Sequence, residues 1–317
     1  MKRWEEDERK RLPDEGRQES KADNVVRSGN GGYAVMSTKT LYIRMFGGFT
    51  IHYGDKAVAL NKADSSKSVR LLQMLFLSPE GEISKNELID HLYGWNENTD
   101  LTNRNKNLNN LIYRLKKQLI ACGLPEEEYI ELSEGMCCFK SSFPMEVDTL
   151  KFEKMVADAQ ESEGVKRYCL LRRANELYCA ELLPANLSNG WFFQKSNYFK
   201  ELYLNTVREL EQIYIQKADY KNRLLLYSRA AAIYPFDNWQ TKQIRCNLEI
   251  YRYEEALDIY HRTLELYARE IGSPPVEEMQ ECFEKANPSD WHDRKDGDEM
   301  VDQDARIRKG WNAMDKA

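Results

Sequence analysis

The sequence has few of the residues on which catalytic and metal sites depend. It holds only four histidines, which lie in separate predicted elements without the spacing of metal ligands or of a catalytic triad. It also lacks a glycine-rich phosphate-binding loop, because Gly47 and Gly48 stand between two predicted strands, where a turn accounts for them. We therefore expect a protein that is not an enzyme and that has no catalytic residues, no cofactor and no metal site.

Long apolar runs and disulfide patterns are absent as well. The longest apolar run, Leu71 to Leu77, is far shorter than the ~20 residues of a membrane span. Residues 1–30 carry mixed charges and no apolar segment, which argues against a secretory signal. The seven cysteines are odd in number and show no CxxC or CxxH spacing, which indicates thiols in a reducing compartment rather than disulfides. These features predict a cytoplasmic protein that does not bind a membrane.

Carboxylates are missing from one segment of an otherwise acidic chain. The formal net charge of −6 argues against nucleic-acid binding through general basicity and leaves only a local patch. In residues 104–119, five apolar side chains recur at helical spacing, and the other positions hold only Arg, Lys, Asn, Gln and Tyr. Arg and Lys neutralise phosphates, and Asn and Arg form paired hydrogen bonds to base edges. The pattern predicts a helix that reads the major groove; the alternative is a solvated surface helix, which usually carries both signs of charge.

The organisation of the chain predicts two domains between two tails. Residues 1–39 are rich in charge and poor in aliphatic residues, so we expect them to be disordered, and residues 287–317 form a second charged tail. Ser84 and Glu87 fit a capping box at the start of a helix. A small sheet, three helices and a hairpin predict an α+β winged helix over residues 40–143, with its third helix in the major groove. These elements are β-rich runs at 41–60, helices at about 65–77, 84–95 and 103–119, and a hairpin at 129–139.

The second domain, residues 146–286, is predicted to be all-α. It contains an internal repeat, because Tyr220 and Tyr253 open two helical segments 33 positions apart, and Tyr227 and Tyr260 keep the same offset. A period near 34 with two helices per unit is typical of tetratricopeptide-like repeats, which stack into a superhelix with a groove. The alternative is a generic helical bundle. The predicted helices are 148–160, 164–180, 191–217, 220–234, 238–251 and 253–271.

The order of these parts resembles the bacterial transcriptional activator family, the antibiotic regulatory protein type of regulators. In that family a winged helix like that of response-regulator outputs precedes a bacterial transcriptional activator domain. The resemblance implies a sequence-specific regulator that binds promoter repeats in double-stranded DNA, often as a homo-oligomer. It further implies that the repeat domain contacts partners such as RNA polymerase. The matching segments are 43–49, 67–75, 83–95, 107–119, 147–153, 174–184, 253–260 and 266–272.

The candidate DNA-binding residues lie on the polar side of the third helix. Most of them face away from the apolar stripe by helical spacing. Arg104, Lys106 and Lys117 are predicted to contact phosphates. Asn107, Asn110 and Arg114 are predicted to read bases, because amide and guanidinium groups pair two hydrogen bonds at once. The full set is Asn103, Arg104, Lys106, Asn107, Asn110, Tyr113, Arg114 and Lys117.

The predicted hairpin departs from the family pattern, in which wings usually carry basic and aromatic residues around a Gly-Tyr turn. Carboxylates near a phosphate backbone weaken binding, so the helix is expected to supply most of the affinity. The rival hypothesis is an interaction module whose winged helix has lost DNA binding and whose aromatic-rich repeat domain is the working surface. Packing of helical pairs is the alternative role for those aromatics. The hairpin residues are Glu131, Glu134, Met136, Cys137 and Cys138.

Overall fold

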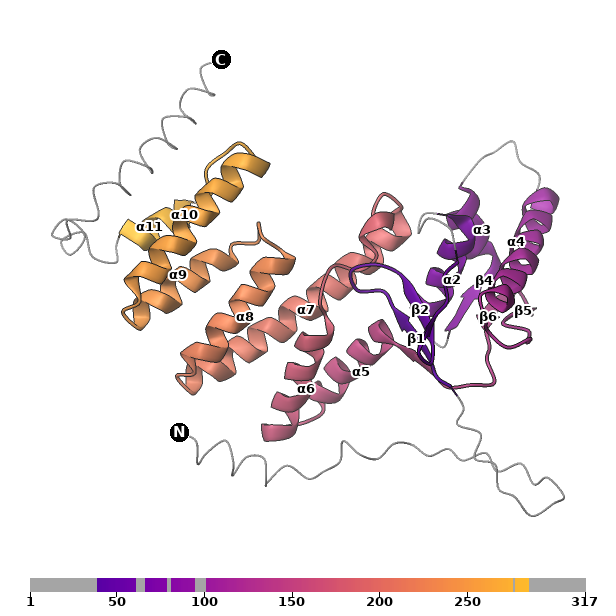
Figure 1. Ribbon diagram of the computed structural model, residues 1–317, viewed down its shortest axis with the longest axis horizontal. Coiled ribbons are helices and arrows are strands. Elements are labelled where there is room, and N and C mark those ends of the chain that lie inside the picture. Colours follow the sequence, from indigo (N-terminus) through magenta and orange to yellow (C-terminus); the bar gives the residue numbers. More distant parts are fainter. Residues whose placement is uncertain (1–38, 61–65, 79–80, 95–100, 276, 285–317) are drawn as a thin grey trace, which may run out of the picture.

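The computed structural model describes residues 39–60, 66–78, 81–94, 101–275 and 277–284 (Figure 1). Almost all of both predicted tails lies outside these ranges. The described chain forms an α/β part at the N-terminal side, followed by a row of helices that extends away from it. None of the described helices combines the length and the apolar composition that crossing a bilayer requires.

The first sheet has the strand order β3-β2-β1-β7. β1 alternates buried Leu41 and Ile43 with exposed Tyr42 and Arg44, because one face of the sheet covers the core. The sequence predicted only antiparallel strands within 41–60, whereas β7 pairs with β1 in parallel. Strand β7 is three residues long and pairs with a strand about a hundred residues away, so no local pattern marks it. The strands are β1 Leu41–Arg44, β2 Thr50–Tyr53, β3 Lys56–Ala57 and β7 Met145–Val147.

Three helices and a second sheet follow the order expected of a winged helix. The second sheet has the order β4-β6-β5, and β5 and β6 form the predicted hairpin. Ser84 caps α3, since its Oγ accepts a hydrogen bond from the backbone N–H of Glu87 at 3.2 Å. The elements are α2 Lys67–Leu77, β4 Glu82–Ser84, α3 Lys85–Tyr93, α4 Leu101–Ala121, β5 Ile130–Ser133 and β6 Met136–Phe139.

The C-terminal part consists of helices in which consecutive members pack against each other. Each of the six helices predicted from sequence is present, with its ends within three residues of the expected ones. The short 3-10 helix η3 and the last helix, α11, were not predicted. The bounds are α5 Asp148–Gln160, α6 Gly164–Leu177, η3 Pro184–Asn186, α7 Gly190–Gln216, α8 Tyr220–Ile233, α9 Trp239–Glu249, α10 Tyr253–Glu270 and α11 Glu277–Glu284.

The internal repeat has a structural counterpart. Tyr220 and Tyr253 are the first residues of α8 and α10. Each follows a tight connection that contains a residue with a left-handed backbone two positions before the helix. This residue is Ala218, with φ of 50°, before α8 and Tyr251, with φ of 59°, before α10. Tyr227 lies two turns after Tyr220 and is buried at the packing surface of α8. Its repeat counterpart, Tyr260, is buried in the same way in α10. The same backbone turn and the same packing position therefore recur 33 residues apart.

The two parts share one hydrophobic core. Phe46, two residues after β1, packs its ring against Phe152 of α5, Tyr178 after α6 and Phe199 of α7, with centroid distances of 5.6, 4.6 and 5.7 Å. Asp148, the first residue of α5, accepts hydrogen bonds from two backbone amides of the same β segment. The predicted boundary near residue 145 is consequently a change of architecture and not a gap in packing.

Candidate nucleic-acid interface

Helix α4 presents one packed face and one open face. Leu108, Leu115 and Leu119 are at most 1% exposed, and Leu111 and Ile112 are half-buried at the edge of the same stripe. This stripe packs on α2 and α3. The amphipathic pattern read from the sequence thus matches the side on which the helix is buried.

The open face carries most of the predicted DNA-binding side chains. Seven of the eight are exposed, and they lie along one side of the helix because their spacing follows the helical period. They are Asn103, Lys106, Asn107, Asn110, Tyr113, Arg114 and Lys117.

Arg104 is the exception, because it is only 8% exposed. It lies four residues before Leu108 and eleven before Leu115, so helical geometry places it on the packed stripe. A guanidinium in that position is turned away from the open face of α4. The structure therefore sets Arg104 apart from the seven exposed residues, and its contact with phosphate stays a prediction.

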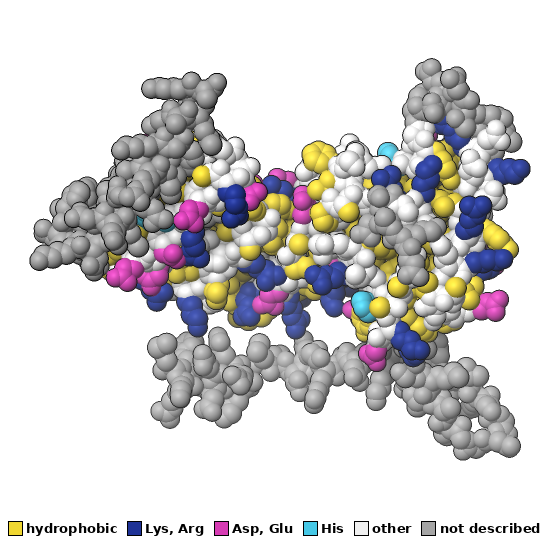
Figure 2. Space-filling view, turned by 45° about the horizontal axis from the view of Figure 1, so that its top comes forward, with side chains coloured by type: hydrophobic (Ala, Val, Ile, Leu, Met, Phe, Trp, Pro, Cys, Tyr) yellow, Lys and Arg dark blue, Asp and Glu magenta, His cyan; other side chains and the backbone are white. Residues whose placement is uncertain are grey.

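The cations on α4 differ in their surroundings. Lys116 forms an ion pair with Glu128 in the acidic segment after the helix. Lys117 instead holds its Nζ 4.5 Å from the centroid of the Tyr113 ring. Within the described ranges, Lys106, Arg114 and Lys117 enter no ion pair. Lys and Arg side chains gather over the end of the molecule that carries α4 (Figure 2). At this end, Lys106, Arg114 and Lys117 offer positive charge with which no carboxylate of the described chain forms an ion pair.

The hairpin beside α4 is less acidic than its sequence suggests. Glu131 pairs with Lys140, which follows β6 on the neighbouring strand. Cys137 and Cys138 are buried, and burial raises the pKa of both thiols, with that of Cys137 reaching about 12. The exposed carboxylate left near the turn is that of Glu134, whose φ of 53° places it in the tight turn with Gly135. The strand register that brings Lys140 next to Glu131 is not visible in the sequence.

Two side chains of the helical domain form hydrogen bonds with α2 and α3, the helices on which α4 packs. Asn186 of η3 donates from Nδ2 to Oε1 of Gln73 in α2 at 2.9 Å, and both residues are fully buried. Trp191 of α7 donates from Nε1 to Oε1 of Glu87 in α3 at 2.9 Å. Glu87 therefore does not complete the predicted capping box but bonds to the other domain. Sequence reasoning missed these residues, since polar side chains at a domain contact carry no periodic signal.

The arrangement defines a class: an α/β unit with an exposed, carboxylate-free helix face, joined through a shared core to stacked helical hairpins. Residues 147–286 match the sequence profile of the bacterial transcriptional activator domain. The chain therefore contains a bacterial transcriptional activator domain, which confirms the resemblance over these residues.

The comparison with solved structures concerns the fold. The structure of Mycobacterium tuberculosis EmbR in complex with a low-affinity phosphopeptide is similar, with a TM-score of 0.50 and 14% sequence identity. The match covers 78% of this chain and 65% of that chain, so this protein spans about 65% of the length of that relative. No curated protein sequence matches the chain.

Proposed function

We propose that this protein is a sequence-specific DNA-binding transcriptional regulator. In this proposal the N-terminal part is a winged helix of the response-regulator output type, and α4 enters the major groove of promoter DNA. The tetratricopeptide-like helical domain serves self-association or contact with a partner such as RNA polymerase. The observation that carries the proposal is the open face of α4, which is polar and cationic and has no carboxylate.

The exposed side chains divide into two roles by their chemistry. Lys106 and Lys117 are suited to phosphates, because an ammonium group is a compact point charge that carries no base preference. Asn107, Asn110 and Arg114 are suited to base edges, because each pairs two hydrogen bonds with a purine. Asn103 and Tyr113 complete the face. The 21 residues of α4 extend over roughly 30 Å, which is ample for several base pairs of contact.

The experiment is selection of bound sequences from a random duplex pool, followed by affinity measurements over a range of salt concentrations. A double variant, Arg114→Ala with Lys117→Ala, is expected to lower the magnitude of the slope of log K against log salt by about 0.9, for the lost phosphate contact of Lys117. It is also expected to weaken binding to the selected motif, because Arg114 no longer pairs with a base edge. Lys116→Ala is the matched control, since its charge is already paired with Glu128. Recovery of one motif that binds the wild type far more tightly than a scrambled duplex supports the proposal.

The second candidate is an interaction module that no longer binds DNA. The exposed carboxylate of Glu134 at the hairpin turn favours it, because a negative charge there repels the phosphate backbone. The aromatic residues that this hypothesis needs at a surface are largely in the core: Trp191, Phe192, Phe199, Tyr203, Tyr214, Tyr227 and Tyr234 are buried, whereas Phe193, Tyr198 and Tyr251 are exposed and Tyr220 is half-buried. Absence of any enriched motif, together with unchanged function in the double variant, would favour this module over the regulator.

A further inference from the structure

A groove of about 460 Å³ lies where the N-terminal half of α8 meets the connection between α9 and α10. Its apolar lining comes from Tyr220, Leu224, Leu225 and Ile250. Leu225 is 59% exposed and adjoins the other three, so the apolar surface here is contiguous and not a single scattered side chain. Figure 1 shows α8, α9 and α10 at the opposite end of the molecule from α4, so this surface is separate from the candidate DNA interface.

The charged residues that line the groove are both cations. Lys221 and Arg252 stand beside the apolar surface, and neither forms an ion pair with another described residue. The lining contains no carboxylate. The groove therefore offers an apolar floor together with two positive charges.

Tyr251 adds an exposed ring in a strained backbone next to the groove. Its neighbours Ile250 and Arg252 line the groove, its φ is 59°, and its side chain is 80% exposed. A bulky residue in the left-handed region is disfavoured. The Tyr251 ring meets that of Tyr253 edge-on with centroids 6.4 Å apart, but it stays too exposed to recover that cost by burial. Ala218 occupies the equivalent position of the preceding repeat with a φ of 50°, so the turn itself does not require an aromatic residue. A strained residue that its own fold does not need points to a role in binding.

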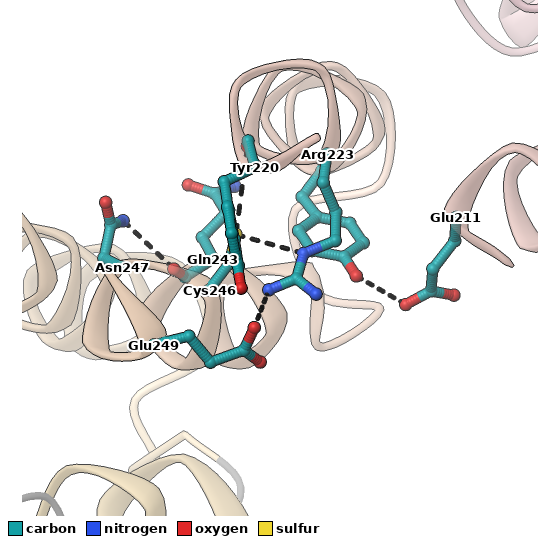
Figure 3. Close-up of polar contacts among 8 residues, drawn as sticks. Glu211, Tyr220, Arg223, Gln243, Cys246, Asn247 and Glu249 are labelled. Carbon is teal, nitrogen blue, oxygen red and sulfur yellow. Dashed lines mark hydrogen bonds and ion pairs between the residues drawn. The ribbon is translucent and has the colours of Figure 1, made fainter. Parts of the chain in front are cut away.

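The walls of the groove are held in place by a polar network between α8 and α9 (Figure 3). Arg223, which is 6% exposed, donates from Nε to Sγ of Cys246 at 3.1 Å and forms an ion pair with Glu249. One turn further along the same face of α8, the hydroxyl of Tyr227 donates to Oε1 of Glu211 in α7 at 2.6 Å. Because Glu249 pairs with Arg223, it does not form an ion pair with Lys221 or Arg252. The network makes the groove a preformed feature of the helical domain.

We propose that this groove binds an acidic segment of a partner protein. A bulky aliphatic or aromatic side chain of that segment occupies the apolar floor and packs against Tyr251, and its carboxylates pair with Lys221 and Arg252. Charge complementarity selects this occupant, because a basic segment would meet two like charges. The inference goes beyond the proposed DNA binding and does not depend on it.

The test is selection of decapeptides from a random display library against the full chain, with fluorescence anisotropy on the enriched peptides. Enriched peptides are expected to combine Asp or Glu with a large apolar residue. Lys221→Glu and Tyr251→Gly are each expected to weaken their binding roughly tenfold or more. Because glycine suits a positive φ, Tyr251→Gly is expected to melt no lower than the wild type, so its loss of binding cannot come from unfolding.

Two matched variants control for backbone and charge effects. Ala218→Gly makes the same backbone change at the equivalent turn, and Lys154→Glu makes the same charge reversal on α5; neither is expected to alter binding. The proposal is overturned if no peptides are enriched, if the enriched peptides lack acidic residues, or if Lys221→Glu and Tyr251→Gly bind them as the wild type does. It is also overturned if duplex DNA displaces the peptides from the Arg114→Ala, Lys117→Ala variant, which would make the groove a nucleic-acid site.

Discussion

Replacing Asp148 by alanine tests how the two parts of the protein are joined. The Oδ2 atom of Asp148 accepts hydrogen bonds from the backbone N–H groups of Met45 and Phe46 at 2.8 and 3.0 Å, and Oδ1 accepts from the N–H of Thr149 at 2.8 Å. Met45 and Phe46 are completely buried. In Asp148→Ala their amides have neither the carboxylate nor water as a partner.

The expected loss of stability follows from these two orphaned amides. Each buried donor left unsatisfied costs about 1–3 kcal/mol. Loss of a negative charge from the first turn of α5 adds about 0.3–1 kcal/mol. Burial raises the pKa of Asp148, which means that the ionised carboxylate is itself disfavoured in the folded state, and removing it returns part of this cost. We therefore expect a net loss of about 2–4 kcal/mol in the free energy of unfolding.

Urea unfolding followed by far-UV circular dichroism measures this loss directly. Glu146→Ala is the control, because Glu146 is an exposed carboxylate whose ion pair with Lys151 lies in solvent, and a change within about 0.5 kcal/mol is expected. If Asp148→Ala loses less than about 1 kcal/mol, the two amides must find other acceptors, and the role assigned to this carboxylate is refuted.

Three further predictions concern single side chains. Asn110→Ala is expected to weaken binding to the selected DNA motif by about 1–3 kcal/mol while leaving binding to a scrambled duplex unchanged, as measured by fluorescence anisotropy; equal losses on both duplexes would refute base reading. Glu134→Lys is expected to raise DNA affinity, with a gain that shrinks as salt increases in the same assay; a gain independent of salt would contradict an electrostatic origin. Finally, burial raises the pKa of Asp148 above its ordinary value of 3.8, so folding favours its protonated form. The stability of the wild type relative to Asp148→Asn should consequently be greatest at low pH and decline as the pH rises through the folded-state pKa. Urea midpoints of the two proteins between about pH 4 and pH 7 measure this decline. A stability difference in favour of the wild type that grows with pH would refute the prediction.

Much of the architecture was predictable because it depends on neighbouring residues. Helix periodicity placed six of the helices of the C-terminal part to within three residues, and Ser84 marked the start of α3 through its own cap. The open face of α4 was predictable for the same reason, since the spacing of Leu108, Leu115 and Leu119 defines which side of the helix is buried. The DNA-binding roles assigned to that face remain predictions.

Other features depend on which distant segments meet, and only the tertiary structure decided them. Strand β7 exists because it pairs with β1, and Glu87 accepts a hydrogen bond from Trp191 because the first turn of α7 reaches α3. Lys140 neutralises Glu131 through the register of a hairpin. Arg104 lies on the apolar stripe, and how far its long side chain reaches solvent depends on what packs against α4, which leaves it 8% exposed. The sequence by itself determined the helices, their polar and apolar faces and the repeat, since these follow from contacts within a few turns. The tertiary structure decided which polar groups become partners, because that depends on residues far apart in the chain.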